Sequence, residues 1–182
     1  MPNLPVSMYR PHMRGIPRHD LPAGFVFRPY GDGDAETWVR IQAAANVPLL
    51  DVTMKTYVDD FAGHEHELPG RSWFVVSPSG REVGSITAWW RETPAGRQGL
   101  IHWVAVVPEC QAKGIGKAMM TKAMDRLREE YGEAYLNTSS ARIPAIKLYL
   151  DFGFLPDMRP GSADEGWAEV RRMLKHPGLG NA

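Results

Sequence analysis

Hydrophobic residues recur along this chain with two different periods, and each period predicts one type of secondary structure. Short runs rich in β-branched and aromatic residues, closed by turn residues, predict strands. The predicted strands are residues 25–28, 72–76, 82–90, 100–107, 134–137, 154–155 and 168–174. The run 100–107 is apolar along most of its length, which is typical of a strand in the middle of a sheet.

Helical spacing of apolar residues appears in four other segments, 34–45, 53–62, 114–131 and 144–152. The third is the clearest, because its apolar residues recur every three or four positions while basic residues occupy the other side. In the fourth, Pro144 lies in the first turn and Gly153 follows the end, as is usual for helices. The predicted order of elements is therefore β-α-α-β-β-β-α-β-α-β-β.

Residues 1–24 differ from the rest because they contain five prolines and scattered arginines without an apolar core. This composition does not fit a secretory signal, and it predicts an extended arm. The favoured interpretation of this arm is a solvated tail. An arm that wraps a partner or a second copy is the alternative. We therefore expect a Pro-rich arm (1–24), one domain (25–176) and a short tail (177–182).

The composition is that of one globular domain, with 182 residues, 43% hydrophobic and 23% charged. Cys110 is the one cysteine, so an intrachain disulfide is impossible, and a reducing, cytoplasmic location is expected. The formal net charge is zero, which argues against a nucleic-acid partner. No apolar run approaches the ~20 residues of a membrane span, so no membrane association is expected.

A glycine-containing loop joins the central strand to the third helix, and it carries the most informative chemistry. Its sequence, Gln-Ala-Lys-Gly-Ile-Gly at 111–116, opens a helix whose first N–H groups and positive dipole end favour an anion such as phosphate. Lys113 and Lys117 could add charged contacts. A P-loop does not fit, because Gln111 and Ala118 replace its Gly and Ser/Thr, and Met119 replaces the third glycine of a dinucleotide fingerprint.

The pattern Val-x-Val-x-Pro-x-x-Gln-x-x-Gly-x-Gly at 104–116 closely resembles motif A of the GCN5-related N-acetyltransferases (GNAT). The resemblance implies that acetyl-CoA is the cosubstrate and that the loop holds its pyrophosphate. The residues implied in that cradle are Gln111, Lys113, Gly114, Ile115, Gly116 and Lys117. The same resemblance implies that the backbone of Val104 and Val106 pairs with the pantetheine arm.

A second match follows, since Ala-Ile-Lys-Leu-Tyr-Leu-Asp-Phe-Gly-Phe at 145–154 resembles motif B of the same superfamily. The resemblance implies that Tyr149 protonates the departing thiolate, although a core tyrosine with a satisfied hydroxyl would also fit. Arg142 stands where the family often has an asparagine that contacts CoA, so a residue at the strand end, Asn137, Thr138 or Ser139, is expected to contribute instead, with Asn137 as the candidate. The resemblance also implies the fold class, an α/β (mixed α+β) GNAT fold with a mostly antiparallel sheet of about seven strands and about four helices.

The reaction also needs an acceptor for the proton of the attacking amine. His102 is the candidate, because strand alternation places it on the face of Val104 and Val106, and imidazole titrates near neutral pH. The chain is similar to arylalkylamine acetyltransferases at this position. A packed histidine without a catalytic role, or a water chain acting as the base, would also fit.

The run His-Glu-His-Glu at 64–67 does not match a zinc motif, and no metal is expected there. It is interpreted as a solvated loop. Because this region often borders the acceptor site in the superfamily, Asp59, Asp60 or Glu65 could instead meet a cationic substrate.

The resemblance therefore implies an enzyme that transfers acetyl from acetyl-CoA directly to a primary amine of a small molecule. Two alternatives stay open, a protein N-terminal or lysine acetyltransferase and a non-catalytic, regulatory acyl-CoA-binding module. A homodimer is a possible assembly.

Overall fold

The computed structural model describes residues 2–158 and 164–180. Seven strands form one sheet in the order β2-β3-β4-β5-β6-β1-β7. They are β1 (Pro5–Arg10), β2 (Val26–Pro29), β3 (Ser72–Val76), β4 (Glu82–Thr93), β5 (Gly96–Val106), β6 (Ala134–Ser139) and β7 (Leu155–Pro156). The α-helices are α1 (Ala35–Asn46), α2 (Met54–Phe61), α3 (Ile115–Arg128), α4 (Ile143–Asp151) and α5 (Asp164–Met173). Three short 3₁₀ helices are η1 (Glu65–Gly70), η2 (Pro108–Cys110) and η3 (Pro177–Leu179).

The predicted mixed α/β fold with a mostly antiparallel, seven-stranded sheet is confirmed. The pairs β1–β6, β1–β7, β2–β3 and β3–β4 are antiparallel, whereas β5 and β6 are parallel. The β5–β6 register joins Gly99 to Ala134 and Leu100 to Tyr135. Contacts divide the chain into two compact units, one made of residues 18–89 and 101–126 and the other of 1–17, 90–100 and 127–182.

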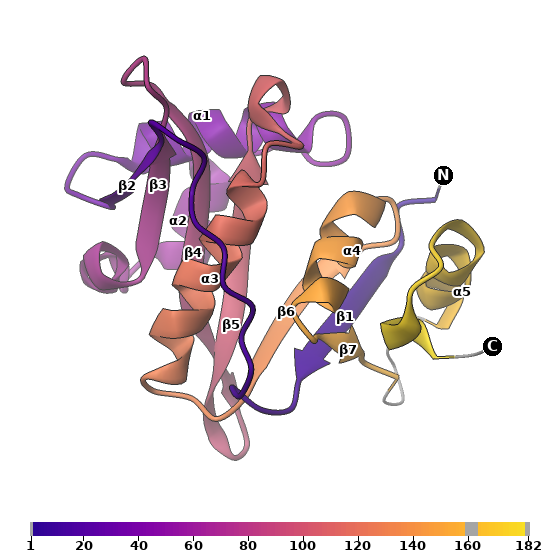
Figure 1. Cartoon of the computed structure of the whole chain (residues 1–182). Helices are drawn as coiled ribbons and strands as arrows, with labels where there is room; N and C mark the ends of the chain where they lie inside the picture. The colour runs from indigo at the N-terminus through magenta and orange to yellow at the C-terminus, as the bar shows by residue number, and fades with distance from the viewer. Residues whose placement is uncertain (1, 159–163, 181–182) are drawn as a thin grey trace. The chain divides into compact units, whose positions relative to one another are not determined.

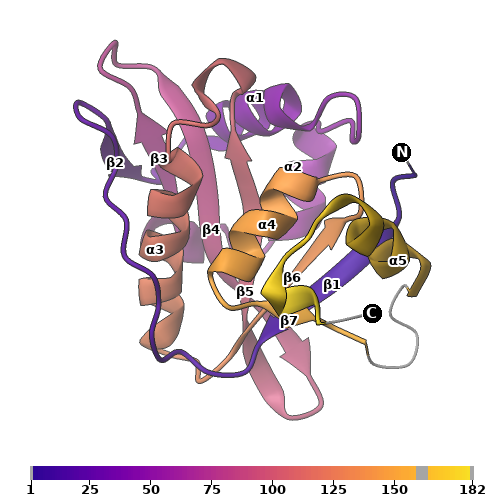
Figure 2. The same cartoon turned by 45° about the vertical axis from the view of Figure 1, so that its right-hand side comes forward.

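In the first unit, helices cover both faces of the sheet, with α1 and α2 on one face and α3 on the other (Figures 1 and 2). The apolar residues that the helical spacing predicted are buried on α1, at Trp38 and Ile41, and on α3, at Met119. On α2, Tyr57 and Phe61 are buried. Trp38 packs edge-on against both, with ring centroids 5.5 Å apart in each pair.

In the second unit, β1 lies between β6 and β7 and buries Val6 and Met8. The prediction of a solvated tail is therefore wrong for residues 5–10. Farther along the same stretch, Arg18 pairs with Asp125 of α3 and the His19 N–H donates to Thr121 Oγ1 over 3.1 Å. The prolines around this segment led to the prediction of a tail. They are compatible with a strand, because they stand only at its exposed start and just beyond its end, where no ladder hydrogen bond is lost.

The predicted strand at 168–174 is also wrong, because residues 168–173 belong to helix α5. Trp167 and Val170 are both fully buried, and their three-residue spacing matches a helix face. Strand alternation would instead have put Trp167 and Val170 on opposite faces. Gly166 lets α5 approach β1 closely, because a Cβ there would lie 3.1 Å from the Pro5 carbonyl oxygen.

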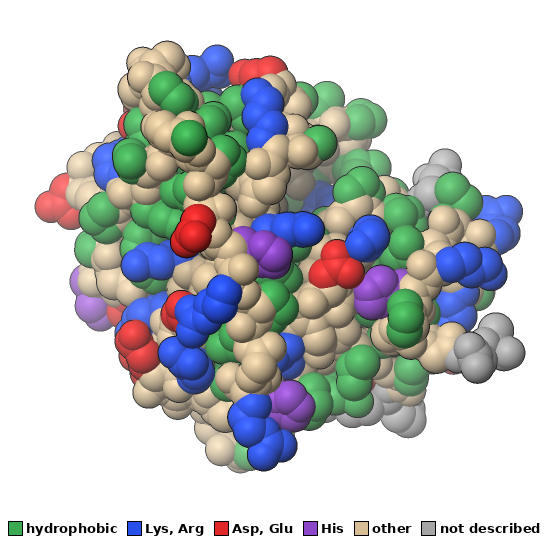
Figure 3. All heavy atoms as spheres, in the orientation of Figure 1, with side chains coloured by type: hydrophobic (Ala, Val, Ile, Leu, Met, Phe, Trp, Pro, Cys, Tyr) green, Lys and Arg blue, Asp and Glu red, His purple; other side chains and the backbone are tan. Residues whose placement is uncertain are grey.

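The exposed surface is mixed in charge. On the face seen in Figure 3, Lys and Arg side chains are interspersed with acidic and hydrophobic ones. Across residues 2–158 and 164–180, no helix has both the length and the apolar content needed to span a bilayer.

Candidate active site

The loop between β5 and α3 has the backbone shape of an anion cradle. Two of its residues have positive φ angles, Ala112 at 59° and Gly114 at 86°. Such a turn brings successive N–H groups to one side, and the helix that follows adds its positive dipole end. The loop from Gln111 to Gly114 is exposed to solvent, so an anion can reach it.

The N–H groups of residues 112–116 have no recorded hydrogen-bond partner within the part of the chain that is described. The first internal bonds of the helix start later, where Lys117 and Ala118 donate to the Gly114 carbonyl over 3.1 and 3.2 Å. The N–H groups before Lys117 are therefore available to a bound phosphate.

Side chains around the loop hold its shape. The Gln111 amide donates to the Val106 carbonyl over 2.9 Å, and Lys113 Nζ donates to the Glu109 carbonyl over 3.0 Å. Lys117 is exposed in the first turn of α3. Ile115 is buried and anchors the helix start in the core, so its contribution to the cradle is its backbone N–H.

Strand β5, which leads into this loop, contains an irregularity that the sequence did not predict. Trp103 has a φ of 50°, in the left-handed region that a tryptophan rarely adopts. Its carbonyl accepts a hydrogen bond of 2.7 Å from Nε2 of Gln42, a fully buried residue of α1. The bond from Gln42 explains how this conformation is held.

The irregularity overturns the expected face of His102. Both His102 and Trp103 point to Asp60 of α2, although adjacent residues of a regular strand point to opposite faces. Val106 lies on the α3 side of the sheet. Its Cγ2 and the sulfur of Met119, a residue of α3, are both close to the point where a Cβ added at Gly84 would lie. His102 therefore does not share a face with Val106, and the premise of simple alternation is wrong.

The surroundings of His102 consist of one carboxylate and aromatic rings. Its Nε2 lies 3.4 Å from Asp60 Oδ1, and the side chains of His102 and Asp60 are 24% and 31% exposed. The indole Nε1–H of Trp103 donates to the other carboxylate oxygen over 2.7 Å. The ring of Phe61 packs edge-on against His102 at 5.9 Å. The imidazole is thus held in place but remains accessible.

Tyr149, the predicted acid, lies in the other unit on α4 and is 7% exposed. Burial raises the pKa of its phenol to about 12, partly offset by the positive charge of Arg142. Its ring packs against Phe154 with centroids 6.3 Å apart. No hydrogen bond of the hydroxyl is recorded among the described residues, so the tyrosine is not explained as a core residue with a satisfied hydroxyl.

Asn137, the remaining predicted CoA contact, is exposed near the end of β6. Its Oδ1 accepts a hydrogen bond of 2.9 Å from the hydroxyl of Ser7 on β1. The amide nitrogen of Asn137 therefore remains the group that could reach a ligand.

In the run at 64–67, Glu65 to Glu67 form the start of η1 and His64 is its N-cap residue, so the run is not an irregular loop. Glu67 pairs with Arg71 over 3.0 Å and lies 3.6 Å from His64 Nδ1. Within residues 2–158 and 164–180, no group of three or more His, Cys, Asp or Glu side chains is arranged to hold a metal.

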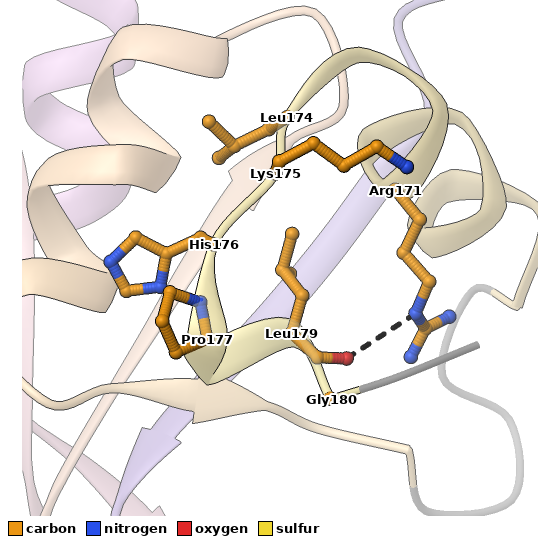
Figure 4. A pocket seen from close by; sticks show the side chains of 7 residues that line it. All are labelled: Arg171, Leu174, Lys175, His176, Pro177, Leu179 and Gly180. Carbon is orange, nitrogen blue, oxygen red and sulfur yellow. Dashed lines mark hydrogen bonds between the residues drawn. The ribbon is translucent and has the colours of Figure 1, made fainter.

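A cavity of about 760 Å³ lies at the C-terminal end of α5 and contains none of the predicted site residues (Figure 4). It is lined by Arg171, Leu174, Lys175, His176, Pro177, Leu179 and Gly180. Arg171 Nε donates to the Leu179 carbonyl over 3.5 Å, as the dashed line shows.

Sequence reasoning missed two residues of the site, Gln42 and Asp60 as partners of β5. The signal for Gln42 was a polar residue on the apolar face of a predicted helix. A buried glutamine needs partners for its amide, so this position pointed to a hydrogen-bonded role. Asp60 was predicted only as a possible contact of a cationic substrate, because no local pattern indicates a hydrogen bond between residues 43 positions apart.

The family model described as the acetyltransferase (GNAT) family matches residues 36–154. A mycothiol acetyltransferase of Pseudarthrobacter chlorophenolicus is 28% identical over 162 residues, covering 83% of this chain and 50% of the relative. N-acetyltransferase 8B of Rattus norvegicus is 30% identical over 118 residues, covering 63% of this chain and 49% of the relative. The chain thus spans about half the length of these curated relatives.

Solved structures show the same fold. A GCN5-related N-acetyltransferase from Sphaerobacter thermophilus aligns with a TM-score of 0.67 at 22% identity, covering 85% of this chain and 49% of that one. Arabidopsis thaliana Naa50, in complex with a bisubstrate analogue, aligns with a TM-score of 0.57 at 17% identity, over 72% and 83% of the two chains. Since the family model covers more than half of the sequence and these structures share its fold, the chain belongs to the acetyltransferase (GNAT) family.

Proposed function

We propose that this chain binds acetyl-CoA at the loop 111–117 and transfers the acetyl group to a primary amine of a small molecule. The observation that carries the proposal is the run of unpaired N–H groups at residues 112–116, which belong to the exposed loop and the first residues of α3. Such a site fits a pyrophosphate, because backbone N–H groups and the helix dipole both favour negative charge. Family membership supports the choice of CoA as the carrier of that pyrophosphate.

A small-molecule acceptor is supported by the names of the relatives. Several of the curated relatives are named mycothiol acetyltransferases. The partly exposed aromatic ring of Trp103 beside His102 also fits a compact acceptor better than an open, acidic peptide groove.

In the proposed reaction, acetyl-CoA supplies an acyl thioester, and the residues of this chain move the protons. His102 accepts the proton of the attacking amine, and Tyr149 provides the proton that the departing sulfur needs. Because burial raises the pKa of Tyr149 to about 12, its hydroxyl keeps that proton at neutral pH. A backbone N–H of β5 would polarise the thioester carbonyl.

The test is thermal unfolding with and without acetyl-CoA, followed by a screen of amines for release of free CoA thiol. Ligand at 100 times its dissociation constant should stabilise the fold by roughly 2.7 kcal/mol, which is visible as a raised midpoint. A raised midpoint together with thiol release supports the proposal. A raised midpoint without turnover on any amine would favour the non-catalytic acyl-CoA-binding module, and no shift at millimolar acetyl-CoA would overturn the proposed site.

A further inference from the structure

We infer that Asp60 is a positioning residue that holds His102 with the proton on Nε2 and thereby leaves Nδ1 free to accept the proton of the acceptor amine. The inference rests on the proposed function, since it assigns a role within the same transfer reaction.

The first observation is that one carboxylate is shared by two adjacent residues of β5. Asp60 Oδ1 lies 3.4 Å from His102 Nε2, and Oδ2 accepts the indole N–H of Trp103 over 2.7 Å. A regular strand cannot present neighbouring side chains to one group, so this arrangement depends on the left-handed conformation of Trp103.

The second observation is that helix α1 holds the irregular backbone of β5 at Trp103 in place. Gln42 Nε2 donates to the Trp103 carbonyl over 2.7 Å and to Ser85 Oγ over 2.9 Å. Asn46 Nδ2 in turn donates to Gln42 Oε1 over 3.2 Å. The position of the His102 ring relative to the Asp60 carboxylate is therefore set by α1, α2 and β5 together.

The chemistry follows from which ring nitrogen faces the carboxylate. A carboxylate can only accept, so it stabilises a proton on Nε2, and the neutral ring then has its lone pair on Nδ1. During transfer, an N–H bond of the amine breaks and an Nδ1–H bond forms. The resulting imidazolium lies beside a negative charge, which stabilises it.

Within the described residues, the recorded neighbours of the His102 ring are Asp60, Phe61 and Trp103. Asp60 is the charged group among them. Because both Asp60 oxygens already face groups of β5, we do not assign this carboxylate to binding of a cationic substrate.

The direct test is nuclear magnetic resonance of protein labelled with ¹⁵N-histidine, recorded at about pH 8, where an ordinary imidazole is neutral. The wild type should show His102 with the proton on Nε2. Asp60→Asn should lose that preference while the one amide oxygen of the asparagine accepts the Trp103 indole N–H in place of Asp60 Oδ2. An unchanged resonance of that indole N–H would show that β5 is intact. Asp51→Asn is the matched control, because Asp51 is an exposed carboxylate just before α2.

The kinetic measurement uses the same variants, with a substrate amine that the screen has shown to be acetylated. Asp60→Asn should lower kcat at least ~10-fold with the KM for acetyl-CoA unchanged, since orientation of the base matters only in the chemical step. Asp51→Asn should keep wild-type kcat.

The inference would be overturned by a proton on Nδ1 in the wild type, by an unchanged tautomer in Asp60→Asn, or by a wild-type kcat in that variant. Failure of the proposed function has a different signature, because acetyl-CoA would then give no thermal shift even though the His102 tautomer responds to Asp60→Asn.

Discussion

At the scale of single residues, the two proposed proton carriers have contrasting surroundings. Tyr149 is buried, and burial disfavours the charged phenolate, so the pKa of its hydroxyl is raised to about 12. His102 is partly exposed and faces a carboxylate, an environment that accommodates a positive charge. One residue is therefore suited to keep a proton until it is needed, and the other to receive one.

Replacing Tyr149 by phenylalanine removes the hydroxyl and retains the ring that packs on Phe154. We expect kcat to fall by about 10²- to 10⁴-fold, the usual contribution of an acid catalyst, while the Kd for acetyl-CoA stays near its wild-type value. Steady-state kinetics and calorimetric titration measure the two quantities. Wild-type turnover in Tyr149→Phe would show that another group, or water, protonates the sulfur.

The same substitution predicts a change in the alkaline stability of the fold. Because the folded-state pKa of Tyr149 is raised from about 10, the value for an unfolded chain, to about 12, its stabilising effect is complete below pH ~10. That stabilisation is lost as the pH rises through about 12. Urea unfolding on both sides of pH ~10 should therefore show a smaller alkaline loss in Tyr149→Phe than in the wild type, and an equal loss would contradict the burial of the hydroxyl.

At the scale of elements, the loop before α3 depends on a backbone conformation that favours glycine. Gly114 has a φ of 86°, and no other atom lies within 4 Å of a Cβ built there. A side chain at this position would therefore meet backbone strain rather than a clash inside the protein. In the proposed complex it would also meet the bound phosphate.

Gly114→Ala should destabilise the fold by about 1–2 kcal/mol and raise the Kd for acetyl-CoA roughly tenfold or more. Gly33→Ala is the matched control, because Gly33 has a φ of 85° and equally open surroundings but lies in the turn before α1. The control should show a similar loss of stability with an unchanged Kd. If both variants bound acetyl-CoA equally well, the loop would not be the pyrophosphate site.

At the scale of the whole molecule, the sheet has seven strands, as predicted, but one of them comes from the opposite end of the chain. The prediction used residues 168–174, whereas the structure uses β1, which pairs with both β6 and β7. The N-terminal residues 5–10 thus belong to the sheet, and their buried side chains contribute to its stability.

Met8 is fully buried on β1, so Met8→Ala should lower the free energy of unfolding by about 2–5 kcal/mol. His12→Ala, at an exposed position just beyond the strand, should change it by less than about 0.5 kcal/mol. Urea unfolding measures both. If Met8→Ala were as mild as His12→Ala, β1 would not be part of the cooperative fold.

The sequence by itself determined the features that depend on local pattern. Helices α1 to α4 and the central strands follow from the period of their apolar residues, and the Gln-x-x-Gly-x-Gly loop from its glycines. It could not assign β1 or α5 correctly, because short segments with prolines or mixed charges have weak periodicity and are decided by what they pack against.

Only the tertiary structure decided how β5 presents its side chains. Alternation predicted that His102 shares a face with Val106, but the left-handed Trp103 turned His102 toward Asp60. This conformation is held in part by a hydrogen bond from Gln42, which lies on a helix and is 61 residues away in the chain. Since a local pattern contains no information about such distant hydrogen bonds, the candidate catalytic residue was found from the sequence, whereas its orientation depends on the folded protein.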